Sequence, residues 1–433
     1  MKEEYKELYL QHGGLMKAAL EKTVCYLNAI GRLNREENVR EETLNVFRLS
    51  CCTWYSLLEN SVIQRELFRA ESQTERTYSI RRLMVTMYEM NKHMFGVEAK
   101  TEKRSLWNAA KQPLYQYDSQ ACSDIERKVQ AFKTGFSTMD TKNARGVFEH
   151  YAETPVILEH QMESQTANVV NIHMTVFIDI MCSLCKLTTH YIAQDDTLSN
   201  YIDASIHFDN DPEMDVNSAL ISTHKLLLMF SNKNVDNNST FDYFYTFARK
   251  LSLLVSKKDN QKARLMQDMH QIQFLCSQIH RDLLYAQLSV VESESRIEEF
   301  LNIRYIFRRM HEGFKRIYGY NEKDHEKSYW AKTVQPYVGG LDDESILNQF
   351  NELEGLLDSY TKGTINDEGK RAVFAHIRVT QKSPEDYIPE LFDRIDKTSI
   401  KSEFGLLTDF CNITMKLSNF TRDLCKEILK TIV

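Results

Sequence analysis

The chain has 433 residues, which is long enough for two units of about 200 residues that each bury a core. It contains only 14 Gly and 6 Pro, so its composition leaves little material for turns and favours long helices. The net charge of −7 excludes a basic surface over the whole chain, so any anion-binding site would have to be a local patch. Bulk charge itself neither supports nor excludes binding to nucleic acid.

Helices are predicted throughout the first half of the chain. We expect them at about 42–69, in the segment that ends at Gly96, and at about 121–139. The helix before Gly96 has the clearest pattern, because apolar residues recur there at helical spacing and Gly96 stands where a C-terminal stop belongs. Its predicted buried face consists of Ile80, Leu83, Met84, Met87 and Met94.

The most apolar stretch of the chain follows, from Val169 to Cys185. It contains Asn171, His173 and Asp179, which are costly in lipid and ordinary in a helix packed on protein. We therefore predict a buried helix and no membrane span. Met1 is followed by Lys-Glu-Glu-Tyr-Lys and not by the apolar segment of a signal peptide, so we expect a cytoplasmic protein.

A polar, acidic stretch from Gln194 to Glu213 predicts a linker between two units, residues 1–200 and residues 201–433. In the second unit we expect helices at about 264–292, in the segment that ends at Gly319, and at about 343–360. The predicted buried face of the middle helix consists of Ile303, Ile306, Phe307, Met310 and Ile317.

An internal repeat relates the two halves. When the chain is aligned with itself at an offset of 223 residues, identical residues recur through the middle helix and beyond it, and the alignment needs no gap there. We therefore expect an all-α chain of two tandem helical bundles, related by an approximate two-fold axis. The matching pairs include Glu75 with Glu298, Ile80 with Ile303, Arg81 with Arg304, Met87 with Met310, Gly96 with Gly319, Ser105 with Ser328, Trp107 with Trp330, and Pro113 with Pro336.

Basic residues gather on the two repeat-related helices. They are Arg81 and Lys92 in the first copy, and Arg304, Arg308, His311 and Lys315 in the second. The four in the second copy share one helix face, which is either an ordinary solvated face or a strip that contacts the phosphate backbone of RNA. Glu89 and Glu312 stand three residues before Lys92 and Lys315, which predicts an ion pair on the solvent side of each helix.

A second motif recurs at an offset of 226 residues, where Arg145-Gly-Val-Phe-Glu-His150 falls on Arg371-Ala-Val-Phe-Ala-His376. An Arg and a His five positions apart form a weak motif alone, but its recurrence at the same place in the repeat, around a shared Val-Phe, exceeds coincidence. Residues five apart point about 140° away from each other on an ideal helix, so each Arg must lie at an irregular helix start to meet its His.

Arg371-Ala-Val-Phe-Ala-His376 resembles the core motif of the HEPN superfamily, which are helical bundles marked by an Arg, four to six residues and a His. The resemblance covers about residues 40–195 and 265–430. It implies a metal-independent ribonuclease of toxin–antitoxin or anti-phage systems, with RNA as the substrate, a protein antitoxin or defence partner, and a homo-oligomer in which two motifs face each other. Here the duplication would supply both motifs within one chain.

The motif residues also suit RNA cleavage on chemical grounds. A neutral imidazole can accept the proton of the 2′-OH, an imidazolium can protonate the leaving 5′-oxygen, and a guanidinium can stabilise charge on the phosphate. The predicted catalytic residues are therefore Arg145, His150, Arg371 and His376.

We predict no cofactor and no metal, because the chain has no phosphate-binding loop, dinucleotide motif or zinc-protease motif. The single Cys182-Ser-Leu-Cys185 pair is interpreted as core packing, and the nine cysteines are expected to be reduced and mostly buried.

A second hypothesis stays open. The chain would then be a catalytically inactive helical protein that binds RNA, a nucleotide or a protein partner through the same interface. Arg145 and Arg371 would brace neighbouring helices through their carbonyls, and His150 and His376 would be packing groups.

Overall fold

The computed structural model describes residues 3–36, 38–70, 73–97, 99–137, 167–202, 261–363 and 400–431. Helices account for every regular element in these residues, and none of them forms a strand. The all-α fold class predicted from the sequence is therefore confirmed.

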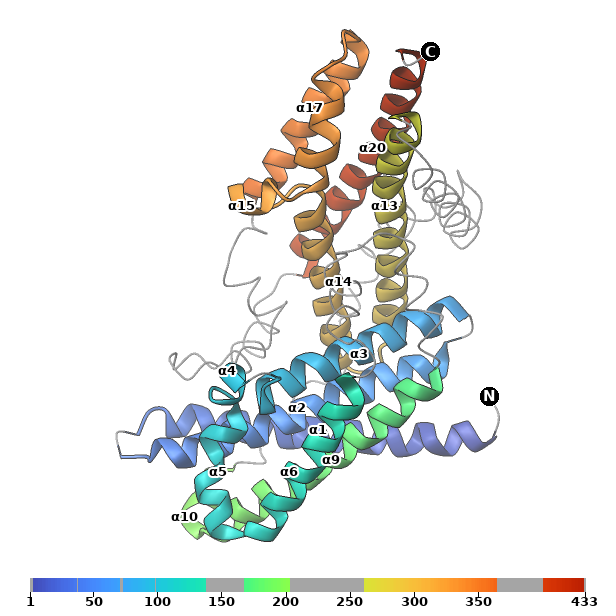
Figure 1. The fold of residues 1–433 in the computed structure, drawn as a ribbon. Helices are drawn as coiled ribbons and strands as arrows, with labels where there is room; N and C mark the ends of the chain where they lie inside the picture. Colours follow the sequence, from blue (N-terminus) through green and yellow to red (C-terminus); the bar gives the residue numbers. More distant parts are fainter. Residues whose placement is uncertain are drawn as a thin grey trace. The chain divides into compact units, whose positions relative to one another are not determined.

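The chain divides into two compact units. The described residues up to 202 belong to the first unit, and those from 261 onwards belong to the second (Figure 1). The predicted boundary at residue 200 stays a prediction, because residues 203–260 lie outside the described part.

The first unit is built around α2, which packs against α1, α3, α5 and α9. Every residue of α2 from Leu44 to Glu66 is buried except Trp54, so this helix is covered around its whole circumference. The helices of the unit are α1 (Glu3–Leu33), α2 (Glu41–Arg69), α3 (Gln73–Phe95), α4 (Ala99–Glu102), α5 (Leu106–Tyr117), α6 (Ser119–Ser137), α9 (Ala167–Ala193) and α10 (Asp196–Ser199).

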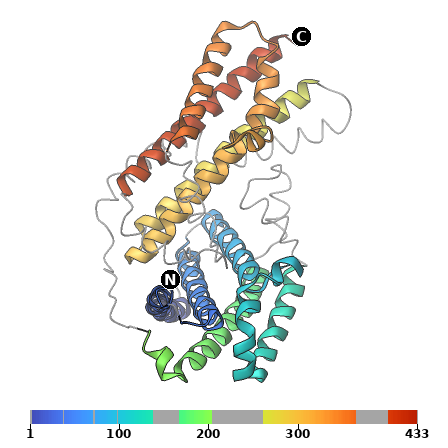
Figure 2. The ribbon, with the colours of Figure 1, turned by 90° about the vertical axis from the view of Figure 1, so that its left-hand side faces the viewer.

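The second unit is built around α13, which packs against α14 and α20, while α17 lies beside α20 (Figures 1 and 2). Its elements are α13 (Gln261–Val291), α14 (Arg296–Ile317), α15 (Glu322–His325), the π-helix η1 (Trp330–Val334), α16 (Gln335–Val338), α17 (Glu344–Lys362) and α20 (Ile400–Thr431).

The helices predicted from apolar spacing are confirmed. The structure places α2, α6, α13 and α17 within three residues of the predicted bounds at each end. Most of the predicted buried faces are buried as well: Leu83, Met84, Met87 and Met94 on α3, and Ile303, Ile306, Met310 and Ile317 on α14. Helices α1, α5 and α20 were not predicted.

The turn after α3 has the same local structure as the turn after α14. Gly96 and Gly319 both adopt positive φ, at 71° and 88°. An added Cβ would lie 2.3 Å from the amide nitrogen of Glu102 at Gly96, and 2.4 Å from that of His325 at Gly319. Both positions therefore need glycine, because its lack of a Cβ permits the left-handed backbone and the close approach of the next short helix.

The match continues beyond these turns. Helices α4 and α15 begin and end at the same offset of 223 residues as the two glycines. The hydroxyl of Ser105 then accepts a hydrogen bond from the amide of Asn108, as that of Ser328 does from the amide of Ala331. The structure thus repeats locally where the sequence repeats, and the predicted two-fold axis stays a prediction.

The last described long helix of each unit carries a matching threonine at an offset of 226 residues. Thr188 on α9 donates to the Leu184 carbonyl at 2.9 Å, and its hydroxyl lies 3.0 Å from that of Ser50 on α2. Thr414 on α20 lies 3.0 Å from the carbonyl of the residue four before it and 2.6 Å from Nε2 of His280 on α13. Each threonine thereby joins the last helix to the central helix of its unit.

The apolar helix α9 is only partly buried. Residues Ile172–Ala193 are long and apolar enough to cross a membrane by length and composition, and 39% of the most apolar window is buried. The buried side is made of Phe177, Ile180, Met181 and Leu184, and α9 packs on α2 and α6. Within the predicted span Val169–Cys185, Ile172, Asp179 and Cys182 are exposed, so the helix that was expected to be buried is buried on one side only.

All nine cysteines are free thiols in this structure, and seven of them are buried. Cys182 is exposed and Cys185 is buried, so the two cysteines of the CxxC pair occupy different environments on α9. Burial raises the pKa of the Cys185 thiol, which keeps that thiol protonated.

We predict that Gly96→Ala lowers the free energy of unfolding by ~1–3 kcal/mol, because any side chain there meets the α4 backbone and strains a left-handed residue. Urea denaturation followed by circular dichroism measures the change. The control is Gly355→Ala in the middle of α17, where nothing lies within 4 Å of an added Cβ and a helical alanine should stabilise by up to ~1 kcal/mol. Equal effects of the two substitutions would contradict the constraint at Gly96.

A second prediction concerns acid. Burial lowers the pKa of His270 to about 4 and that of His280 to about 3. In the unfolded chain these histidines have a pKa near ~6.5. Below that pH the unfolded chain therefore binds protons at positions where the folded chain does not. The contribution of the two neutral histidines to the free energy of unfolding is therefore fully present above about pH 6.5. It decreases as the pH falls toward 4, by up to ~1.4 kcal/mol per pH unit for each histidine.

Urea denaturation at several pH values tests this, with the double variant His270→Gln and His280→Gln beside the wild type. The variant should lose stability less steeply between about pH 6.5 and pH 5. An identical slope in the two proteins would show that these histidines do not carry the acid sensitivity.

Candidate functional site

The four predicted catalytic residues, Arg145, His150, Arg371 and His376, lie outside the described residues. The first motif belongs to the segment 138–166 and the second to the segment 364–399. The structure therefore neither brings these residues together nor separates them. It does describe the helices on either side of each segment.

The helices that flank the first motif segment are in contact close to it. Phe132 in the last turns of α6 packs on α9, with its ring centroid 5.4 Å from that of Phe177 and 6.4 Å from that of His173. Gly135 allows a close approach, because a Cβ there would lie 3.2 Å from Cε1 of His173. Partial burial lowers the pKa of His173. The two helices that flank the segment 138–166, α6 and α9, therefore pack against each other close to it.

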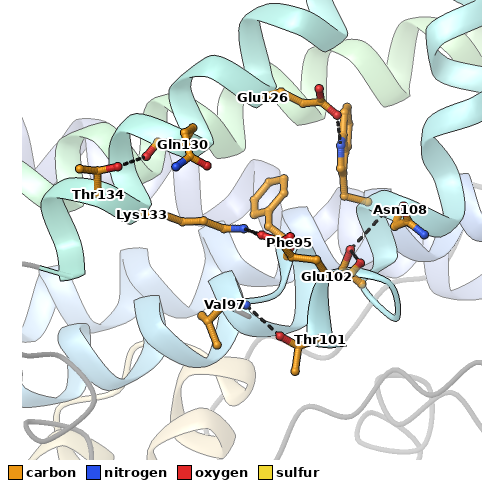
Figure 3. Close-up of polar contacts among 11 residues, drawn as sticks. Phe95, Val97, Thr101, Glu102, Asn108, Glu126, Gln130, Lys133 and Thr134 are labelled. Atoms are coloured by element: carbon orange, nitrogen blue, oxygen red, sulfur yellow. Dashed lines mark hydrogen bonds and ion pairs between the residues drawn. The ribbon is translucent and has the colours of Figure 1, made fainter. Parts of the chain in front are cut away.

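Lys133 fixes the same end of α6 to two other helices (Figure 3). Its Nζ lies 2.8 Å from Oε1 of Glu102 on α4 and donates to the Phe95 carbonyl at the end of α3, at 3.3 Å. A lysine at a helix C-terminus is favourable because the unpaired carbonyls carry partial negative charge. The Lys133 side chain is only 17% exposed, whereas its partner Glu102 is 51% exposed, so solvent reaches the ion pair from the Glu102 side.

Glu126 holds the middle of α6 against α5. Its carboxylate accepts from Nε1 of Trp107 at 2.9 Å and from the hydroxyl of Tyr115 at 2.8 Å, and Lys111 lies 3.4 Å away. Burial alone would raise the pKa of Glu126, but the hydrogen bonds from Trp107 and Tyr115 and the charge of Lys111 lower it. A carboxylate held ionised in this way serves as an acceptor between helices and is poorly suited to give up a proton.

The second unit uses the same kind of contact. Nε1 of Trp330 donates to Oε1 of Glu354 on α17 at 3.3 Å, and Gln335 donates to the same oxygen at 3.2 Å. The ring of Trp330 also stacks on Phe350, with 4.9 Å between centroids. A repeat-related tryptophan therefore positions the helix that precedes each motif segment.

The basic residues predicted to bind RNA are not on the surface as a group. Arg81 on α3 and Arg304, Arg308 and His311 on α14 are each at most 6% exposed, whereas Lys92 and Lys315 are half-buried. Both interpretations offered from the sequence, a solvated face or a phosphate-contacting strip, expected exposed side chains. The expected exposure is therefore wrong for Arg81, Arg304, Arg308 and His311. Contact of these residues, Lys92 and Lys315 with RNA stays a prediction.

The physical reason is that α14 is covered on its polar side as well as on its apolar side. His311 stacks on Tyr320, with the ring centroids 4.4 Å apart and the planes 9° from parallel. The carboxylates of Glu89 and Glu312, expected on the solvent side, are also buried. Lys315 has an ion pair with Asp324 at 3.7 Å. Helical spacing shows which residues share a face, but it does not show whether a neighbour covers that face.

The sequence did not single out an open groove of about 290 Å³ in the first unit, between the beginning of α6 and the end of α9. Basic side chains line it, namely Arg127, Lys128, Lys186 and His190. Lys186 and His190 are four residues apart on α9, which places them on one face of the helix. This spacing could have indicated a basic face from the sequence. It was not considered, because the apolar residues just before it led us to interpret the helix only as buried.

No protein-family model, curated protein or solved structure matches this chain. Among the described residues, His, Cys, Asp and Glu form no group of three or more that could hold a metal ion.

Proposed function

We propose that the chain is a tandem HEPN-like protein that cleaves RNA without a metal, through one composite site made of Arg145, His150, Arg371 and His376. The observation that carries the proposal is the position of the two motifs in the repeat. Each motif lies in the segment between the helix positioned by the repeated tryptophan and the last long helix of its unit.

The spacing of the motifs agrees with the structure that surrounds them. The offset of 226 residues that relates the two motifs also relates Thr188 on α9 to Thr414 on α20. Each motif is therefore the same number of residues from a threonine that joins the last helix to the central helix. This agreement supports a common origin of the two motif segments together with the bundles that hold them.

The proposed chemistry uses the nucleophile of the RNA itself. One imidazole, His150 or His376, accepts the proton of a 2′-OH while the 2′-oxygen attacks the adjacent phosphorus. The bond from phosphorus to the 5′-oxygen breaks, and the other imidazole, as imidazolium, protonates that oxygen. Arg145 and Arg371 stabilise the charge on the phosphoryl oxygens. The products are a 2′,3′-cyclic phosphate and a 5′-hydroxyl.

The second candidate function is RNA, nucleotide or protein binding without catalysis. It is favoured by Gly146 and Ala372, which directly follow the motif arginines where active members of the HEPN superfamily usually carry a polar residue. The burial of Arg81, Arg304 and Arg308 also shows that arginines in this chain can be structural. The cleavage experiment below decides between the two functions.

We predict that the purified protein cleaves mixed RNA in the presence of EDTA, leaves 2′,3′-cyclic phosphate or 3′-phosphate ends, and does not cleave DNA. His376→Ala should lower the rate by roughly 10²–10⁴-fold, and Arg371→Ala should be comparably damaging, because these groups carry the proton transfer and the charge stabilisation. His150→Ala should be nearly as harmful if both units share one site. Gel analysis of labelled RNA measures the rates.

The matched control is His160→Ala, which removes a histidine from the same segment but outside the motif and should leave the rate unchanged. Circular dichroism should show that all variants keep their helix content. Equal cleavage by the wild type and by the double variant His150→Ala and His376→Ala would end the enzyme proposal, as would intact RNA in every reaction. The binding function would then take its place.

A further inference from the structure

The groove between α6 and α9 has the composition of a site for a phosphate-bearing chain. Arg127 and Lys128 on α6 face Ser183, Lys186 and His190 on α9 across an opening of about 290 Å³. The helices are in direct contact beneath the groove. The basic side chains are therefore presented from two rigid elements.

Two of the basic residues of the groove have carboxylate partners. Asp124 pairs with Arg127 at 3.0 Å, and Lys128 pairs with Asp179 at 2.7 Å. Asp118, the remaining acidic residue of the lining, accepts the Ala121 amide at 2.9 Å. None of these contacts involves Lys186 or His190.

Lys186 and His190 are left over. Neither makes a hydrogen bond or an ion pair with any residue that the structure describes, and both are exposed. They share one face of α9 and line the same groove. Two basic side chains are therefore available to an external anion.

The second unit shows that the fold does not need these residues. At an offset of 226 residues, Asn412 takes the place of Lys186 and Lys416 takes the place of His190. Lys416 pairs with Glu352 across α20 and α17, at 2.6 Å. The buried faces of α6 and α17 match at an offset of 228 residues, for instance Ile125 with Leu353.

At that offset, Gly355 and Leu356 replace Arg127 and Lys128. The second unit, in which Lys416 is paired with Glu352, therefore forms the matching helices α17 and α20 without this set of basic residues. This set of basic residues is therefore absent from the matching positions of α17 and α20, and the packing that the two units share does not explain it.

An aromatic pair adjoins the basic residues. Tyr117 lines the groove, and its ring lies 5.7 Å from that of Tyr191 in an edge-to-face arrangement. Both side chains are partly exposed. Basic side chains beside an accessible aromatic face are typical of sites for single-stranded nucleic acid, where the backbone meets the charges and a base stacks on the ring.

We propose that this groove binds single-stranded RNA, with Lys186 and His190 on the phosphates and Tyr117 beside a base. The choice of RNA as the ligand rests on the function proposed above, but binding through phosphates and rings does not use the 2′-OH. The same groove should therefore hold single-stranded DNA and 2′-O-methyl RNA, neither of which the proposed cleavage chemistry can cut.

The test measures binding separately from cleavage. Fluorescence anisotropy of a labelled 2′-O-methyl RNA oligonucleotide, and of single-stranded DNA of the same sequence, is followed over a range of salt concentrations. The double variant Lys186→Ala and His190→Ala should bind about tenfold more weakly at low salt, and the slope of log K against log salt should decrease by ~0.7 for each phosphate that the variant no longer neutralises.

The matched control is the double variant Lys416→Ala and Lys426→Ala on α20, which removes two exposed basic groups that already have carboxylate partners. It removes at least as much positive charge, so a general loss of charge would weaken binding equally in both variants. We expect the control to bind as the wild type does.

Three outcomes would overturn the groove proposal: no binding by the wild type, equal affinity of wild type and groove variant, or equally weakened binding in groove variant and control. If a poly-glutamate peptide binds instead of the oligonucleotides and loses affinity in the groove variant, the groove serves an acidic protein and RNA is the wrong ligand. Loss of binding in the groove variant with no cleavage by the wild type would uphold the groove and overturn only the ribonuclease.

Discussion

The left-handed turn at Gly96, and its counterpart at Gly319, is the constraint on which the rest of each unit depends. The turn brings the backbone of the next short helix so close that no side chain fits. The hydroxyl of the serine that follows accepts a hydrogen bond from the amide of the residue after Trp107 or Trp330, and the indole reaches a glutamate on the next long helix. One backbone requirement thereby sets the position of α6 in the first unit and of α17 in the second.

These two helices matter because each leads into a motif segment. In the first unit, Lys133 and Phe132 fix the last turns of α6 to α3, α4 and α9. A site that must hold a phosphate between two histidines needs such rigid support, since small displacements weaken proton transfer and charge stabilisation. The groove at the other end of α6 and α9 adds a place where a strand could be held without taking part in the chemistry.

Apolar spacing, glycine and the repeat were enough to predict α2, α3, α6, α9, α13, α14 and α17, because burial of one face and a left-handed stop are local properties. They did not predict α1, α5 or α20. The exposure of Arg304 and His311 was predicted wrongly, since it depends on what covers a second face of α14. The groove was missed for a similar reason. The sequence does not show that Lys416 forms an ion pair, with Glu352, while Lys186 and His190 form none with the described residues.

The central claim, that the two motifs form one site, is tested most directly by crosslinking. His150 and His376 are replaced by Cys in a chain whose Cys182 and Cys425 are Ser, because the other seven native thiols are buried. A thiol crosslinker about as long as a phosphodiester should join positions 150 and 376 within one chain, as shown by mass spectrometry after proteolysis. Full reaction of both cysteines with a monofunctional reagent, but no crosslink between them, would contradict the composite site.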